Sequence, residues 1–189
     1  PKDVRACIAM ARQLGVDVPL LRAVDEVNEQ QKRTIVPKIK ELVGDGGLAG
    51  KTITLWGLSF KPKTDDIREA SALIVMEQLL AEGANLRVFD PEAMKNVQQW
   101  LAEHAPTVVK EKKDNVVFAQ NVYEAAQDTD ALVLMTEWDE FRQVDFAKLA
   151  KLVNSKNIID GRNIYVQETL QQHGFAYKGI GRGNYDRKA

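Results

Sequence analysis

The first 43 residues carry apolar positions at the spacing of an α-helix. Residues 4–14 form one such stripe, and Gly15 follows it as a residue suited to end a helix. A second stripe runs from Leu20 to Val43. Because Pro37 lies inside this second stripe and proline lacks an amide hydrogen, the pattern predicts either a kinked helix or two abutting helices.

The remainder of the chain alternates short apolar runs with helical stretches. The runs predicted as strands are 52–57, 86–89, 116–119, 131–135 and 158–159, and Tyr177 closes the series. The helices predicted between them cover 66–80, 91–103, 122–127, 146–152 and 164–172. The run 131–135 is apolar throughout, which is typical of a strand covered on both faces. This alternation predicts an α/β fold, a Rossmann-like doubly wound parallel sheet with right-handed crossovers.

A glycine-rich segment, GDGGLAG at residues 44–50, is the clearest boundary in the chain. It separates the helical residues 1–43 from the residues with alternating strands and helices, 51–189. We therefore expect a helical segment, a connector and one sheet domain.

Composition excludes several classes of protein. The chain has 26 Lys and Arg against 27 Asp and Glu, so its formal net charge of -1 provides no strong attraction for nucleic acid or an anionic membrane. Its longest apolar runs are too short to cross a bilayer. Its two histidines have no partner at metal-ligand spacing, and we expect no metal site.

The chain has one cysteine, Cys7, which excludes an internal disulfide and is compatible with a reducing cytoplasm. Because Cys7 lies in the middle of the first helical stripe, we expect an inert thiol packed against apolar neighbours.

In an open parallel sheet, ligands bind beyond the carboxyl ends of the strands. The loop after the first predicted strand, GLSFKPKTDDIRE, contains three cations and three carboxylates. The cations suit a phosphate ligand, whereas the equal number of carboxylates suits an ordinary charge-balanced surface loop. From the residues alone, both interpretations stay open.

The fingerprint of a dinucleotide site is missing from this first turn. Only Gly57 of the expected G-x-G-x-x-G is present, so ordinary binding of a pyrophosphate there is not expected. Asp90 follows the second predicted strand, where such folds place a ribose-binding acid. Since Pro91 comes next, we favour a helix cap for Asp90.

Four segments together resemble the UDP-glucose/GDP-mannose dehydrogenase family. They are PKDVRA at 1–6, GLSFKPKTDDIREA at 57–70, TEWDEFR at 136–142 and DGRNIY at 160–165. Their order and spacing extend over essentially the whole chain. The IREA and WDEFR sequences look most like the UDP-glucose branch, with the GDP-mannose and UDP-N-acetylmannosaminuronate branches as alternatives.

This resemblance implies a role in oxidising the primary alcohol of a sugar nucleotide with two NAD⁺, through a cysteine thioester. In the family that cysteine lies two residues before the PKD segment, so we expect a fragment cut after the cysteine, inactive alone. The resemblance also implies that residues 51–189 bind UDP-glucose and that the helix around 20–43 forms a homodimer.

The resemblance further assigns roles to six residues. Asp3 matches the catalytic acid that orders the hydrolytic water. Lys2 and Arg68 match cofactor contacts, Arg68 at the NAD pyrophosphate. Phe60, Lys61 and Arg162 match substrate contacts.

The two arginines have a plainer alternative role in exposed ion pairs. Arg68 has Asp65 and Glu69 nearby in sequence, and Arg162 has Asp160. Such pairs contribute only ~0–1 kcal/mol, so stability gives little reason for their presence. Trp138 fits core packing better than a wall of the site.

A non-catalytic nucleotide-binding module is the competing class of function. A phosphorylated receiver domain would require an aspartate after the third strand, but that predicted strand ends near Ala119 without one. The receiver alternative is therefore poor.

Overall fold

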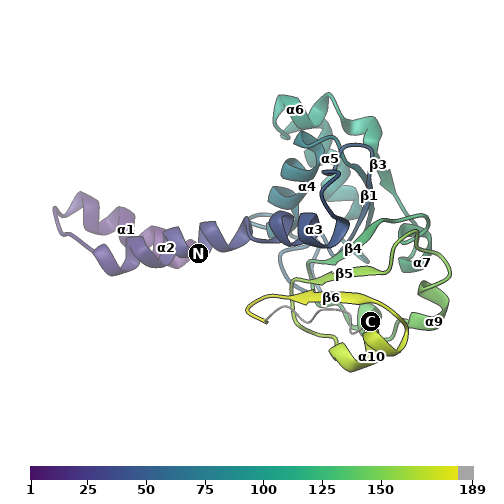
Figure 1. Ribbon diagram of the computed structural model, residues 1–189. Helices are drawn as coiled ribbons and strands as arrows, with labels where there is room; N and C mark the ends of the chain where they lie inside the picture. Colours follow the sequence, from purple (N-terminus) through teal and green to yellow (C-terminus); the bar gives the residue numbers. More distant parts are fainter. Residues whose placement is uncertain (183–189) are drawn as a thin grey trace. The chain divides into compact units, whose positions relative to one another are not determined.

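The computed structural model describes residues 1–182, and the chain divides into two compact units. The first unit covers residues 1–34, and the second begins at residue 35. Figure 1 shows the helices of the first unit and the sheet of the second.

The first unit is a pair of helices, α1 (Lys2–Gln13) and α2 (Pro19–Lys32), packed against each other (Figure 1). Gly15 lies between them with a φ of +68°, a conformation that glycine adopts without strain. The Arg5 guanidinium on α1 donates to Asp25 at 3.0 Å and also to Glu29, both on α2. Both predicted helices are confirmed.

Apolar side chains remain exposed on this unit. α1 contains no buried residue, and Cys7 is exposed, so the prediction of a packed thiol is wrong. The reason is that α1 has one neighbouring helix within its unit, and that helix does not cover the thiol. The exposed large hydrophobic residues of the unit are Met10, Leu14, Val16, Leu20, Val24 and Val27.

The second unit begins with α3 (Ile35–Val43), so the long apolar stripe forms two helices. Pro37 occupies the first turn of α3, where the missing amide hydrogen breaks no helical hydrogen bond. Ile35, Val36 and Ile39 are buried, and α3 contacts β4 and β5. This part of the stripe therefore packs on its own sheet.

Six parallel strands form one sheet in the order β3-β2-β1-β4-β5-β6. The strands are β1 (Thr52–Trp56), β2 (Asn85–Phe89), β3 (Val116–Phe118), β4 (Ala131–Leu134), β5 (Asn157–Asp160) and β6 (Ala176–Gly179). This order is the doubly wound order of a Rossmann fold, and it switches direction between β1 and β4. The predicted fold class is confirmed.

Helices cover both faces of the sheet, and each face has its own apolar core. The remaining helices are α4 (Ser71–Ala81), α5 (Met94–Glu103), α6 (Thr107–Lys110), α7 (Val122–Ala125), α8 (Asp139–Arg142), α9 (Phe146–Leu149) and α10 (Gln167–Gln172), with a 3-10 turn at Lys113–Asn115. Successive strand residues enter opposite cores: Val133 of β4 joins one core, and Leu132 and Leu134 join the other.

Three short elements, α6, α8 and the 3-10 turn, were not anticipated by the pattern. Residues 110–113, with the sequence KEKK, form a charged run in which two lysines donate to helix carbonyls. Lys110 donates to the Glu103 carbonyl at the end of α5 at 2.7 Å, and Lys112 donates to the Leu80 carbonyl of α4 at 2.8 Å.

Candidate functional site

The carboxyl ends of β1, β2, β4 and β5 meet at one edge of the sheet, and the loops that follow them carry most of the predicted site residues. The loop after β1 is long, because α4 begins at Ser71 rather than near residue 66. This length lets residues 57–70 reach beyond the strand ends instead of turning directly into a helix.

Asp90, at the end of β2, caps a turn. Its side chain is 1% exposed, and its Oδ1 accepts hydrogen bonds from the amides of Glu92 at 2.9 Å and Ala93 at 2.8 Å. These bonds hold the turn that precedes α5. The N-cap of α5 itself is Ala93, which makes no side-chain cap bond, so the prediction that Asp90 caps the helix is wrong: the carboxylate caps the turn before it, because α5 begins at Met94.

Gly57 has a φ of +87°, and a Cβ atom on it would lie 2.5 Å from the amide nitrogen of Thr136. The space beside this glycine is therefore occupied by the loop after β4, not left for a phosphate. With Asp90 buried and no further glycine in the turn, this edge does not fit a dinucleotide bound in the ordinary Rossmann manner.

Phe60 and Lys61 project from the loop after β1. Phe60 is 39% exposed although it is a large apolar side chain, and Lys61 is also exposed. The Phe60 amide donates to the Asp66 carbonyl at 2.8 Å, and this bond closes the segment 60–66. An exposed aromatic ring beside an exposed ammonium group can contact a base or sugar and a phosphate at the same time.

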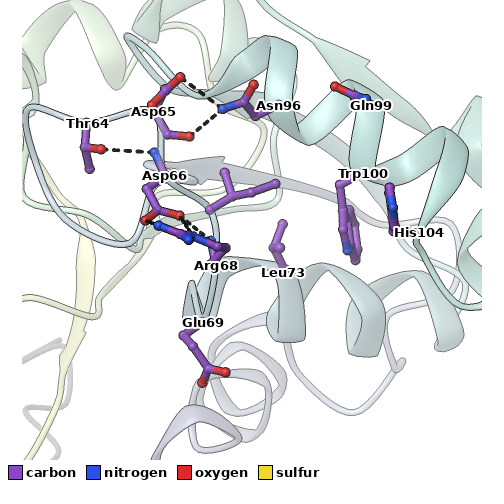
Figure 2. A pocket seen from close by; sticks show the side chains of 11 residues that line it. Thr64, Asp65, Asp66, Arg68, Glu69, Leu73, Asn96, Gln99, Trp100 and His104 are labelled. Carbon is purple, nitrogen blue, oxygen red and sulfur yellow. Dashed lines mark hydrogen bonds and ion pairs between the residues drawn. The ribbon is translucent and has the colours of Figure 1, made fainter. Parts of the chain in front are cut away.

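Arg68 lies on the same loop and is paired with Asp66 (Figure 2). Its Nε lies 2.9 Å from Oδ1 and its Nη2 lies 2.7 Å from Oδ2 of that carboxylate. These hydrogen bonds and the charge of the guanidinium lower the pKa of Asp66 to about 2. Arg68 thus forms an ion pair, as the alternative from the sequence predicted, but the partner is Asp66, which that alternative did not include. The Arg68 side chain is 87% exposed.

A pocket of about 760 Å³ lies between this part of the loop and α5 (Figure 2). Its lining includes three carboxylates, those of Asp65, Asp66 and Glu69, and the guanidinium of Arg68. The Asn96 side chain of α5 ties the loop down by donating to the backbone carbonyl and carboxylate of Asp65 at 2.9 and 3.1 Å. Such a lining attracts a pyrophosphate only if Arg68 leaves Asp66.

Arg162 follows β5, and its contacts differ from the predicted pair with the Asp160 carboxylate. The Arg162 Nε donates to the Met135 carbonyl at 2.6 Å and lies 3.1 Å from Oε2 of Glu137. Asp160 instead accepts from the backbone amide of Arg162 at 3.0 Å. The side chain is held over the loop after β4 and remains 36% exposed.

Asp160 is fully buried and organises the loop that contains Arg162. It accepts from the Tyr165 amide at 2.9 Å and from the Tyr177 hydroxyl at 3.3 Å. Burial and the nearby Asp160 charge raise the pKa of Tyr177 to about 12, while Arg182 opposes this shift. Burial raises the pKa of Tyr165 further. Both phenols are therefore neutral hydrogen-bond donors at physiological pH.

Lys2 and Asp3 lie at the start of α1 in the first unit, and both are exposed. A carboxylate in the first turn of a helix is favoured by the helix dipole, which gives Asp3 a structural role as well. The structure thus places these two residues on a different unit from Phe60, Lys61, Arg68 and Arg162.

Sequence reasoning missed the buried polar residues beneath the exposed ones. Ser59, Thr136 and Asp160 are at most 2% exposed. The Ser59 and Thr136 side chains hydrogen-bond to neighbouring loops, and Asp160 accepts from the Tyr165 amide of its own loop. The sequence could have indicated these residues, because all three are polar and lie at or just beyond the carboxyl end of a predicted strand. Trp138, expected to pack, is 8% exposed and does so.

Two findings concern only residues 1–182. No group of three or more His, Cys, Asp or Glu side chains there could hold a metal ion. No helix in the same range is long and apolar enough to cross a membrane.

The strand order and the polar loops at the switch point define a Rossmann-like nucleotide-binding class that lacks the dinucleotide turn. Residues 54–167 match the UDP binding domain of the UDP-glucose/GDP-mannose dehydrogenase family. The chain belongs to this family of dehydrogenases.

Individual relatives agree with this membership. The chain is 42% identical over 182 residues to the UDP-glucose 6-dehydrogenase of Pseudomonas aeruginosa, a match covering 96% of this chain and 39% of that protein. It therefore spans about two fifths of that relative's length.

Solved structures show the same fold in two branches. A UDP-glucose dehydrogenase from Pyrobaculum islandicum matches with a TM-score of 0.74 and 27% identity, covering 97% of this chain and 37% of the other. A GDP-mannose dehydrogenase from Pseudomonas aeruginosa matches with a TM-score of 0.65 and 27% identity, covering 95% and 38%. The fold alone therefore does not distinguish the nucleotide.

Proposed function

We propose that this chain is the UDP-sugar-binding portion of an NAD-dependent dehydrogenase that oxidises UDP-glucose to UDP-glucuronate in the cytoplasm. The observation that carries the proposal is the 42% identity, over 96% of the chain, to a UDP-glucose 6-dehydrogenase. The match of residues 54–167 to a UDP binding domain supports the same ligand.

Phe60, Lys61 and Arg162 are the proposed contacts of UDP-glucose. All three lie beyond carboxyl ends of strands, where parallel sheets bind ligands, and all three are accessible. Lys61 supplies a mobile positive charge for a phosphate, and Arg162 supplies a planar guanidinium whose orientation is set by the Met135 carbonyl.

Asp3, Lys2 and Arg68 are proposed to act in the complete enzyme. Asp3 would order the water that hydrolyses a thioester, a task suited to a carboxylate. Lys2 and Arg68 would contact NAD, with Arg68 exchanging Asp66 for the pyrophosphate. The nicotinamide cofactor supplies the oxidant, and no residue described in the second unit forms a standard dinucleotide site for it.

A homodimer through the helix around 20–43 is the proposed assembly. Leu20, Val24 and Val27 of α2 are 75%, 47% and 63% exposed and follow helical spacing. Exposed apolar side chains at such spacing are typical of a helix that packs against a partner. Ile35 and Ile39 already belong to the core of the sheet unit, so the proposed contact is the exposed face of α2.

Titration of the 189-residue chain with UDP, GDP and UMP tests the proposal. We expect UDP to bind more tightly than GDP, and UMP to bind more weakly than UDP because it lacks the second phosphate. Tighter binding of GDP would overturn the UDP-glucose branch, and binding of none of the three would overturn the nucleotide-sugar role. We also expect no reduction of NAD⁺ with UDP-glucose by this chain alone.

A further inference from the structure

We propose that Asp90 is a positioning residue that fixes the loop carrying Phe60 and Lys61, and that nucleotide-sugar binding depends on this carboxylate. The proposal rests on the proposed function, since it concerns the same ligand. In a dinucleotide-binding sheet, an acid at the end of the second strand binds the ribose. Here the corresponding acid binds its own protein.

Both oxygens of the Asp90 carboxylate are occupied by protein donors. While Oδ1 caps the turn before α5, Oδ2 accepts from the Leu58 amide at 2.7 Å and from the Ser59 amide at 3.0 Å. The Ser59 hydroxyl also donates to Oδ2, at 3.0 Å. A fourth donor, the indole Nε1 of Trp138, lies 3.1 Å away. One carboxylate therefore joins the ends of β2, β1 and β4.

The loop after β4 makes further hydrogen bonds to the same segment. The Thr136 hydroxyl donates to the Ser59 carbonyl at 2.6 Å, and Trp138 Nε1 lies 3.1 Å from the Ser59 hydroxyl. Ser59 is 2% exposed and Thr136 is fully buried. The residues immediately before Phe60 are thus fixed on two sides, whereas Phe60 itself is exposed.

A rigid base beneath an exposed tip is the arrangement that lowers the entropic cost of ligand binding. A buried carboxylate persists only when donors surround it, and its removal leaves those donors without partners. Changing Asp90 to Asn keeps the size of the side chain but places an NH₂ group, which cannot accept a hydrogen bond, against one of the two sets of amide donors. It also removes the negative charge, which weakens the hydrogen bonds that the remaining oxygen accepts from Leu58 and Ser59. The loop should then lose its fixed conformation.

The test compares the wild-type 189-residue chain with Asp90→Asn and with the control Asp130→Asn. The Asp130 carboxylate accepts from the Thr52 amide at 2.9 Å, at the opposite edge of the sheet. Amide hydrogen exchange at Leu58 and Ser59 reports the loop. Exchange at Val133, in the fully buried central strand β4, reports global unfolding. Calorimetry gives the UDP affinity.

We expect Asp90→Asn to speed exchange at Leu58 and Ser59 at least about tenfold more than at Val133, and to weaken UDP binding about tenfold. Asp130→Asn should change neither quantity. Equal acceleration at all three amides, or unchanged UDP affinity in Asp90→Asn, would overturn the proposal.

If Asp90→Asn does not fold, Ser59→Ala decides the question, because it removes one donor to Asp90 and keeps the backbone bonds. Faster exchange at Leu58 together with weaker UDP binding supports the proposal, and no change in either contradicts it. If the wild-type chain does not bind UDP, the proposed function fails, and the dependence of binding on Asp90 fails with it. Loop-specific exchange in Asp90→Asn would then assign Asp90 a role in loop structure alone.

Discussion

At the scale of single residues, Lys61 is the most direct test of phosphate recognition. We expect Lys61→Met to weaken UDP binding about tenfold, because a charge-assisted hydrogen bond contributes about 1.5–3 kcal/mol. Lys63→Met is the matched control, since Lys63 is an exposed lysine of the same loop. Calorimetric titration of both variants separates a specific contact from the general charge of the loop. Equal losses in the two variants would contradict a specific role for Lys61.

Tyr177 makes the free energy of unfolding depend on pH in the alkaline range. Its folded pKa of about 12 lies above the ordinary value of 10.0, so the neutral phenol stabilises the fold fully below pH 10. This stabilisation, at most about 3 kcal/mol, is lost as the pH rises from 10 towards 12.

Urea unfolding at pH 8 to 12 measures this effect. We expect Tyr177→Phe to start with a lower free energy of unfolding, because the hydroxyl bond to Asp160 is missing, and to fall less steeply above pH 10. The same slope in the wild-type chain and the variant would show that folding does not raise the pKa of Tyr177.

At the scale of elements, Gly57 shows how the loops after β1 and β4 depend on each other. Gly57→Ala should lower the free energy of unfolding by about 3 kcal/mol, since the positive φ is strained for alanine and the Cβ meets the Thr136 backbone. Gly46→Ala is the control, because nothing lies within 4 Å of a Cβ there. Urea unfolding measures the free energy of unfolding of both variants. Equal stability of the two variants would contradict the close packing of Gly57 against Thr136.

The strands and longer helices were predictable because apolar periodicity encodes them directly. The run 131–135 had no polar position and became the buried β4. The starts of α4 and α5 were missed because hydrogen-bonded turns precede both helices, and such turns have no apolar periodicity. Asp90 holds the turn before Met94, and the four-residue helix α8 has too little pattern to be recognised.

The same distinction applies to the candidate site. Its location at the carboxyl edge followed from strand order, and family resemblance supplied Phe60, Lys61 and Arg162. The partners of Arg162 could not be predicted, because Met135 and Glu137 come from a loop that is distant in sequence. The prediction of a packed thiol at Cys7 was wrong because a helical stripe of apolar residues does not indicate which surface covers it.

At the scale of the whole molecule, the exposed face of α2 predicts self-association. We expect the wild-type chain to sediment as a dimer and Val27→Lys to sediment as a monomer, since a charge in an apolar contact is costly. Val166→Lys, at a residue 62% exposed in the sheet unit, is the control and should remain a dimer. Sedimentation equilibrium decides between these outcomes. A monomeric wild-type chain at all concentrations would contradict the dimer.

The proposed function places UDP at the carboxyl edge of this sheet, against the loops after β1 and β5. Chemical-shift mapping of the isotopically labelled chain during a UDP titration tests it most directly. We predict saturable shifts at the amides of residues 58–61 and 161–163, with small changes at the opposite edge near Thr52 and Asp130. Shifts confined to the pocket beside Asn96 and Trp100, or no saturable shifts, would contradict UDP binding at these two loops.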